Sequence, residues 1–83
     1  MEKLTDLPNI GKVLAIRLNE AGIRTPEDLI SVGAEQAFSM IKIEDKGACI
    51  NMLFALEGAV QGIRWHALSA NRKEKLKSFI KSF

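Results

Sequence analysis

The chain has 83 residues, of which 47% are hydrophobic and 27% charged, and this composition predicts one folded domain over residues 1–83 and excludes a disordered segment. So short a chain has one core and little room for a deep catalytic pocket, so we expect no enzyme. The net charge of +2 is unevenly distributed. Residues 1–68 carry seven Lys and Arg against nine Asp and Glu, whereas residues 69–83 carry five against one. The chain as a whole is therefore less basic than a dedicated nucleic-acid binder usually is.

Helix signals begin near the N-terminus, and the alternation typical of strands is missing throughout. Three apolar residues and a turn signal come first: Leu4, Leu7, Ile10 and the pair Pro8-Asn9. A helix is then expected from Lys12 to Ala21, closed by Gly22 in the usual position after the last turn.

The segment Thr25-Pro26-Glu27-Asp28 is a strong helix start. It combines a capping hydroxyl, a proline suited to the first helical position and two carboxylates that face the positive end of the helix dipole. The short helix that follows should end at Gly33. Another is expected from Ala34 to Lys42, before a loop at residues 44–47.

The run from Ala48 to Ile63 is apolar around most of its circumference, which predicts the central buried helix. Gly58 and Gly62 lie four residues apart on its small polar face and favour close approach by another helix. After a bend at residues 65–68, Ser69 can cap a last helix whose apolar stripe is Leu76, Phe79, Ile80 and Phe83. The predicted fold is all-α, a compact bundle of about five or six helices.

The first and second quarters of the chain share an internal repeat. Five positions match residues of the same kind 22 positions later: Leu7, Ile10, Gly11, Ala15 and Leu18 match Leu29, Val32, Gly33, Ala37 and Met40. Two copies of helix, tight turn and helix would produce this pattern, and chance recurrence is the alternative.

The segment from Leu4 to Leu18 resembles a helix-hairpin-helix element, in which a tight turn of the form Gly-apolar-Gly joins two helices. Ile10 would be the buried apolar plug, Gly11 would let the backbone turn into the second helix, and Ala15 would allow close approach. The sequence departs from the motif at Asn9, which replaces the first glycine. Asn tolerates the left-handed conformation, but its side chain is expected to crowd an approaching phosphate.

Such a turn can bind phosphate. Unpaired amides of Ile10, Gly11 and Lys12 would point outward at the positive end of a helix dipole. Lys12 would add a charge, and Arg17 would reach a neighbouring phosphate. These contacts read the DNA backbone and not the bases. A hairpin that serves only as a structural turn is the alternative.

The last helix carries a basic surface that consists of Arg72, Lys73, Lys75, Lys77 and Lys81. These side chains form a solvated face, a phosphate-facing surface or a dock for an acidic partner. If they contact nucleic acid, binding should weaken steeply with salt.

A wider resemblance covers about residues 4–80. The order Leu7-Pro8-Asn9-Ile10-Gly11, Ala21-Gly22-Ile23, Thr25-Pro26-Glu27-Asp28-Leu29 and, most specifically, Ala55-Leu56-Glu57-Gly58-Ala59 before Gly62 and Trp65 is similar to the TfoX/Sxy C-terminal domain family. The resemblance implies a compact helix-hairpin-helix or SAM-domain-like fold and an association with bacterial competence regulation. It also implies a separate N-terminal α/β domain in the parent proteins, which this sequence is expected to lack.

Single polar residues in apolar surroundings give structural predictions. Glu57 needs a partner within its apolar helix, for which Arg64, Arg17 and free backbone amides are the alternatives. Cys49 begins an apolar run and is expected to behave as a small hydrophobe. His66 is expected to orient Trp65, a core residue, or to lie on the surface. One histidine and one cysteine far apart give no metal-ligand spacing, so no metal, cofactor or catalytic residue is expected.

Two functions remain open at this point. The first is a non-enzymatic regulatory module of the competence type that touches DNA backbone, without sequence preference, through the hairpin and the basic helix. The second is a protein-interaction module that binds a transcription-regulatory protein or a second copy of itself, motivated by the terminal apolar stripe. The chain has neither a signal-peptide pattern nor a 20-residue apolar stretch, so we expect a cytoplasmic protein without membrane contact.

Overall fold

Five α-helices and two short 3-10 helices form the computed structural model, which describes residues 3–45 and 47–82. Their order is η1 (Leu4–Asp6), α1 (Lys12–Glu20), α2 (Pro26–Val32), α3 (Ala34–Glu44), α4 (Ile50–Gln61), η2 (Trp65–Ala67) and α5 (Ala70–Ile80). No strand occurs within these ranges, and the predicted all-α class is confirmed. No helix found there has the length and apolar content to cross a membrane.

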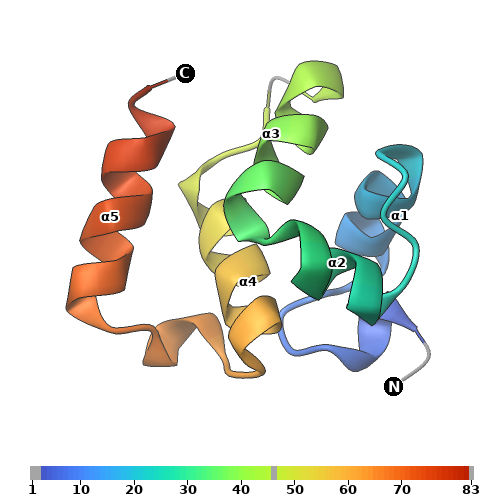
Figure 1. Cartoon of the computed structure of the whole chain (residues 1–83), viewed down its shortest axis with the longest axis horizontal. Coiled ribbons are helices and arrows are strands. Elements are labelled where there is room, and N and C mark those ends of the chain that lie inside the picture. The colour runs from blue at the N-terminus through green and yellow to red at the C-terminus, as the bar shows by residue number, and fades with distance from the viewer. Residues whose placement is uncertain (1–2, 46, 83) are drawn as a thin grey trace.

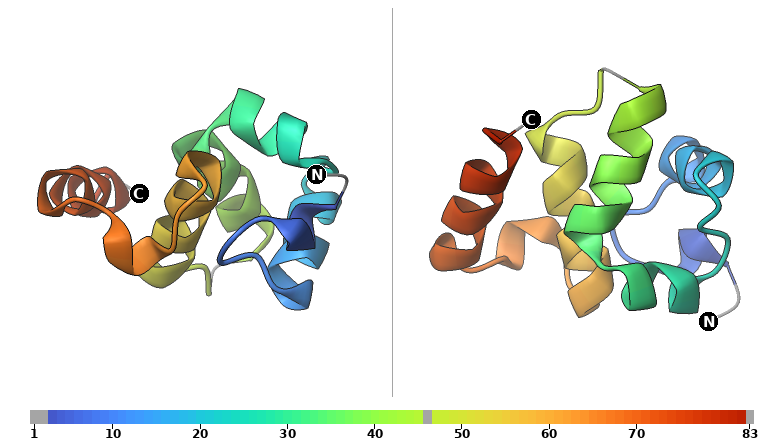
Figure 2. Two further views of the ribbon diagram at one scale, coloured as in Figure 1. Left: turned by 90° about the horizontal axis from the view of Figure 1, so that it is seen from below. Right: turned by 45° about the horizontal axis from the view of Figure 1, so that its top comes forward.

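Helix α4 lies between the two flanks of the molecule (Figure 1). Helix α3 packs against one side of α4, and α5 packs against the other. Helices α1 and α2 and the short η1 lie beyond α3, so α1 and α5 are at opposite ends of the longest axis in every view (Figures 1 and 2). Helix α1 and the basic helix α5 therefore occupy separate flanks of the fold, while the loop before α1 reaches the end of α4 (Figure 1).

The predicted helix ends are largely confirmed. Thr25 Oγ1 accepts a hydrogen bond from the Asp28 amide at 3.0 Å, and Ser69 Oγ accepts one from the Arg72 amide at 3.0 Å. Both contacts satisfy an amide at a helix start that has no partner within the helix. Gly22, with φ of +89°, follows α1 as predicted.

The core is continuous from η1 to α5. Its side chains that are almost wholly buried include Leu18, Ile23, Leu29, Phe38, Leu53, Leu56 and Leu76. Of the predicted stripe on α5, Leu76 is buried and Phe79 and Ile80 are half-buried, while Phe83 lies outside the described residues. Cys49 is expected to behave as a small hydrophobe, but it is exposed at the N-cap of α4 and does not pack in the core.

The two copies of the internal repeat both place a glycine at a helix N-cap, but they differ in which residue is left-handed. Gly11 and Gly33 both stand at the N-cap of a helix, α1 and α3 respectively. The left-handed residue is Gly33 itself in the second copy, with φ of +87°, but Asn9 in the first, with φ of +70°. The segment before the turn is a 3-10 helix of three residues in the first copy and the seven-residue α2 in the second.

Candidate nucleic-acid interface

The predicted hairpin turn is present, with a shortened first arm. Leu7 ends η1, and its carbonyl accepts a hydrogen bond from the Ile10 amide at 3.4 Å. Ile10 is buried at 5% exposure, so its role as an apolar plug is confirmed. Gly11 is extended, with φ of −91°, and leads directly into α1. A single 3-10 turn thus replaces the first helix of the motif.

The side chain of Asn9 points into the protein. Its Nδ2 donates to the Ile63 carbonyl at 2.9 Å and, more weakly, to the Ala55 carbonyl at 3.4 Å. Its Oδ1 accepts a hydrogen bond from the Trp65 amide at 3.1 Å. The expectation that Asn9 crowds a phosphate is therefore wrong. A side-chain amide both donates and accepts, and here it attaches the turn to the end of α4 and the start of η2.

Gly58 provides the space for this contact. A Cβ atom at Gly58 would lie 2.5 Å from Asn9 Nδ2 and 2.8 Å from the Ile63 carbonyl oxygen. The close approach at Gly58 is therefore to a side chain and a loop, and the predicted contact with another helix is wrong. Gly62 has a different role, because its φ of +75° ends α4 in the left-handed conformation.

The amides at the start of α1 form an open edge. Gly11 and Lys12 are exposed, and no carbonyl or side chain among the described residues accepts a hydrogen bond from the amides of Gly11, Lys12 or Val13. The Ile10 amide is different, since it donates to Leu7. The prediction of outward amides thus holds for Gly11 and Lys12, fails for Ile10, and extends to Val13.

Two exposed cationic residues belong to the segments that meet at this turn. Lys12 is the first residue of α1, and Arg64 lies between Ile63 and Trp65, two of the three residues whose backbone atoms bond to Asn9. Both are exposed, and neither forms an ion pair within residues 3–45 and 47–82. The sequence does not associate Arg64 with the hairpin, because the two are remote along the chain and no local pattern joins the two segments.

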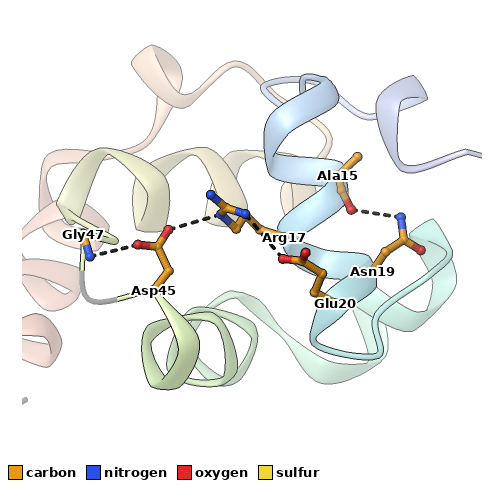
Figure 3. Close-up of polar contacts among 6 residues, drawn as sticks. All are labelled: Ala15, Arg17, Asn19, Glu20, Asp45 and Gly47. Carbon is orange, nitrogen blue, oxygen red and sulfur yellow. Dashed lines mark hydrogen bonds and ion pairs between the residues drawn. The ribbon is translucent and has the colours of Figure 1, made fainter.

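Arg17 has partners of its own. Its Nε lies 3.3 Å from Asp45 Oδ2, and its Nη1 lies 3.4 Å from Glu20 Oε1 (Figure 3). Asp45 also accepts a hydrogen bond from the Gly47 amide, so Arg17 joins α1 to the loop after α3. A phosphate contact by Arg17 would have to compete with these carboxylates, and Arg17 is the weakest member of the predicted set.

The predicted basic surface of α5 is divided. Arg72 bonds to Glu57 and lies 3.9 Å from Glu35, and Lys77 lies 3.5 Å from Glu74. Lys73 Nζ lies over the Trp65 ring at 5.7 Å from its centroid. The exposed Lys75 and Lys81 remain without an ion pair in the described chain. Helix α5 lies on the flank opposite α1, and its start is connected through η2 to the end of α4 (Figure 1).

Glu57 is paired within a cleft of about 470 Å³ between the α2–α3 turn, α4 and α5. Its Oε1 accepts a hydrogen bond from Arg72 Nη2 at 3.0 Å, and its Oε2 accepts one from Gln61 Nε2 at 2.5 Å. All three expected partners, Arg64, Arg17 and backbone amides, are therefore wrong. Burial raises the pKa of Glu57, but the hydrogen bonds from Arg72 and Gln61 and the Arg72 charge outweigh it and lower the pKa below its ordinary value.

This pair predicts a pH effect on stability. Because the pKa of Glu57 is lowered on folding, its stabilisation is complete above the ordinary carboxyl pKa of about 4.3 and is lost as the pH falls through the folded value. We expect Glu57→Gln to cost about 1–2 kcal/mol at neutral pH and to flatten the decline in unfolding free energy below about pH 5. Urea titrations at several pH values measure this. The exposed Glu20→Gln is the control, and equal pH profiles for both variants would contradict the assignment.

His66 and Cys49 do not meet at a metal site. No group of three or more His, Cys, Asp and Glu side chains that could hold a metal occurs in the described part of the chain. His66 is exposed and stacks on Trp65 at a centroid distance of 3.9 Å, so it combines the two expected roles, surface position and contact with Trp65.

The comparisons with known proteins agree with this fold. The family model described as the TfoX C-terminal domain matches residues 1–80, which confirms the resemblance seen in the sequence. Protein Sxy of Escherichia coli (strain K12) is 35% identical over 75 residues, 90% of this chain and 36% of that protein. The chain therefore spans little more than a third of the length of this relative.

Two crystal structures from Listeria monocytogenes are similar along almost their whole length. A triclinic form of an uncharacterised protein has 52% identity and a TM-score of 0.95, covering 96% of this chain and 91% of that one. A tetragonal form of a protein of unknown function has 53% identity and a TM-score of 0.93, covering 95% of this chain and 96% of that one.

Proposed function

The chain belongs to the TfoX C-terminal domain family, and from this premise we propose that it is a non-catalytic regulatory module of the competence type that contacts the DNA backbone through its hairpin edge. The hairpin edge consists of the open amides of Gly11, Lys12 and Val13 with the side chains of Lys12 and Arg64. This chain spans 36% of its relative protein Sxy, so the competence-type role that the family resemblance implies is part of the proposal for this chain.

The observation that carries the proposal is the attachment made by Asn9. Two of its three hydrogen bonds go to Ile63 and Trp65, on either side of Arg64, and the third goes to Ala55. This contact holds the backbone of Arg64 against the turn that leads into the open amides of α1, which supports a shared role for Arg64 and these amides. Amides at the positive end of a helix dipole and a cationic side chain are the groups that bind a phosphate oxygen. They recognise no base, so the expected binding is independent of sequence.

Charge reversal at the hairpin edge tests the proposal. We expect Lys12→Glu and Arg64→Glu each to weaken binding to a duplex of about 20 base pairs roughly tenfold at about 0.1 M salt, and each to reduce the salt slope by about 1. Fluorescence anisotropy of a labelled duplex measures both quantities. Lys81→Glu is the matched control, because it makes the same charge change beyond α5, on the opposite flank. Equal losses of duplex affinity in all three variants would show that binding depends only on the net charge of the chain, and would refute a defined edge.

A specific observation also favours a protein contact. Val13 and Ile16, one helical turn apart on α1, are 70% and 47% exposed. The terminal stripe predicted for this role is less suitable, since Phe79 and Ile80 are half-buried against the chain's own core. If a protein contact is the function, Val13→Ser with Ile16→Ser should abolish self-association in sedimentation velocity while the hairpin charge reversals leave it intact. A wild-type chain that sediments as a monomer at every concentration contradicts the dimer.

A further inference from the structure

Three aromatic rings run from the core to the surface beside the hairpin edge. Phe54 is 7% exposed, and its ring stacks near that of Trp65, with centroids 6.0 Å apart and an interplanar angle of 17°. The half-buried Trp65 in turn stacks on the exposed His66, with centroids 3.9 Å apart and an angle of 30°. The outermost ring is therefore held in place by packing that extends into the core.

A cationic group lies over this stack. Lys73 Nζ lies 5.7 Å from the centroid of the Trp65 ring, and the exposed Arg64 directly precedes Trp65 in the chain. The stack also adjoins the hairpin, because Asn9 Oδ1 accepts a hydrogen bond from the Trp65 amide. A surface aromatic pair with a lysine over one ring, attached to a candidate phosphate-binding turn, combines the two elements of single-strand recognition: a stacking platform and charges for the backbone.

We propose that the Trp65–His66 pair is a stacking platform for an unpaired nucleobase, and that Arg64 and Lys73 contact the phosphates of the same strand. This inference rests on the proposed function, since it extends the hairpin edge along η2, and it names single-stranded DNA as the preferred ligand. In a duplex the faces of the bases are already covered by their neighbours. An unpaired base has a free face, and stacking on an aromatic ring favours it over the duplex by about tenfold or more.

The sole tryptophan of the chain makes the test direct. Trp65 fluorescence is titrated with a short oligothymidylate, with an abasic strand that has the same phosphates, and with a duplex. We expect quenching and about tenfold tighter binding with the oligothymidylate than with either other probe. His66→Ala should remove most of this preference, and His66→Phe should restore it. An oligouridylate arm distinguishes DNA from RNA as the source of the base: RNA binding as tight as DNA binding overturns the choice of DNA.

The outcomes separate the platform from the proposed function. Equal affinity for the oligothymidylate and the abasic strand, or no effect of His66→Ala on oligothymidylate binding, overturns the platform. Duplex anisotropy is the independent measurement, and His66→Ala should leave it unchanged. If the duplex does not bind while oligothymidylate quenching still depends on His66, the duplex function fails and the platform stands. If duplex binding depends on Lys12 and Arg64 while the base preference is absent, the platform alone fails.

Discussion

Asn9→Gly is expected to destabilise the chain by about 2–3 kcal/mol, although glycine is the residue that the turn conformation itself favours. Asn9 has φ of +70°, which a glycine adopts without steric cost. The expected loss comes from the side chain. Its removal leaves the Ile63 carbonyl and the Trp65 amide without their partner in a half-buried position, and unmade hydrogen bonds there cost more than made ones contribute.

Urea denaturation of three variants isolates this contribution. Asn9→Asp keeps the acceptor for the Trp65 amide but sets a carboxylate oxygen against the carbonyl oxygens of Ile63 and Ala55, so we expect a loss at least as large as that of Asn9→Gly. Asn19→Ala is the control, because Asn19 is exposed and the one described hydrogen bond of its side chain goes to the Ala15 carbonyl, within its own helix. Its replacement should change the unfolding free energy by no more than about 0.5 kcal/mol. An Asn9→Gly chain as stable as the wild type would show that the Asn9 contacts contribute nothing.

Gly58→Ala is expected to cost about 2–3 kcal/mol, against the usual sign of this substitution in a helix. Inside a helix, alanine is ordinarily favoured over glycine by about 1 kcal/mol. At Gly58 the added Cβ would lie 2.5 Å from Asn9 Nδ2, 2.8 Å from the Ile63 carbonyl oxygen and 3.1 Å from the Trp65 amide nitrogen. Two of these atoms belong to the backbone, so relief requires the loop to move.

The matched control is Gly11→Ala. Gly11 has a negative φ, and a Cβ there meets nothing within 4 Å, so its stability should change by no more than about 0.5 kcal/mol. Combining Gly58→Ala with Asn9→Gly should cost less than the two separate losses together, because the closest clash is with the Asn9 side chain. Strictly additive losses, or a stabilising Gly58→Ala, would contradict the proposed fit between these residues.

Both substitutions also bear on function. Arg64 is positioned by the same backbone that Asn9 and Gly58 hold. Loosening this contact should therefore reduce duplex affinity under conditions where the variant is still folded. A variant that loses stability but keeps full affinity would separate the hairpin edge from the Asn9 contacts.

Features that depend on neighbouring residues were predicted correctly from the sequence. Thr25 and Ser69 cap their helices, Gly22 closes α1, and Ile10 is buried, because each outcome is decided within a few residues along the chain. The family resemblance rested on the same kind of local pattern. The position of Cys49 was missed by a small margin, since an apolar run does not reveal on which residue its helix begins.

Features that depend on distant residues were missed. Of the two partners of Glu57, Arg72 lies 15 residues away across a bend, whereas Gln61 lies one helical turn away and was missed although it is local. Asn9 bonds to atoms 46 to 56 residues away. A single sequence carries no signal for such pairs. Gly58 is an example, because the sequence predicts a helix packed against it, whereas the side chain of Asn9 occupies the space. The proposal for Arg64 likewise depends on the contact between Asn9 and the backbone beside Arg64.

Two-dimensional NMR of the labelled chain during titration with a short duplex tests whether the amides of Gly11, Lys12 and Val13 and the side chains of Lys12 and Arg64 form one phosphate-binding edge. We predict that the largest shift changes fall on these amides and on the Arg64 side chain, and that they vanish as salt is raised. Changes confined to α5, or to the exposed Val13 and Ile16 side chains without the amides, would contradict it.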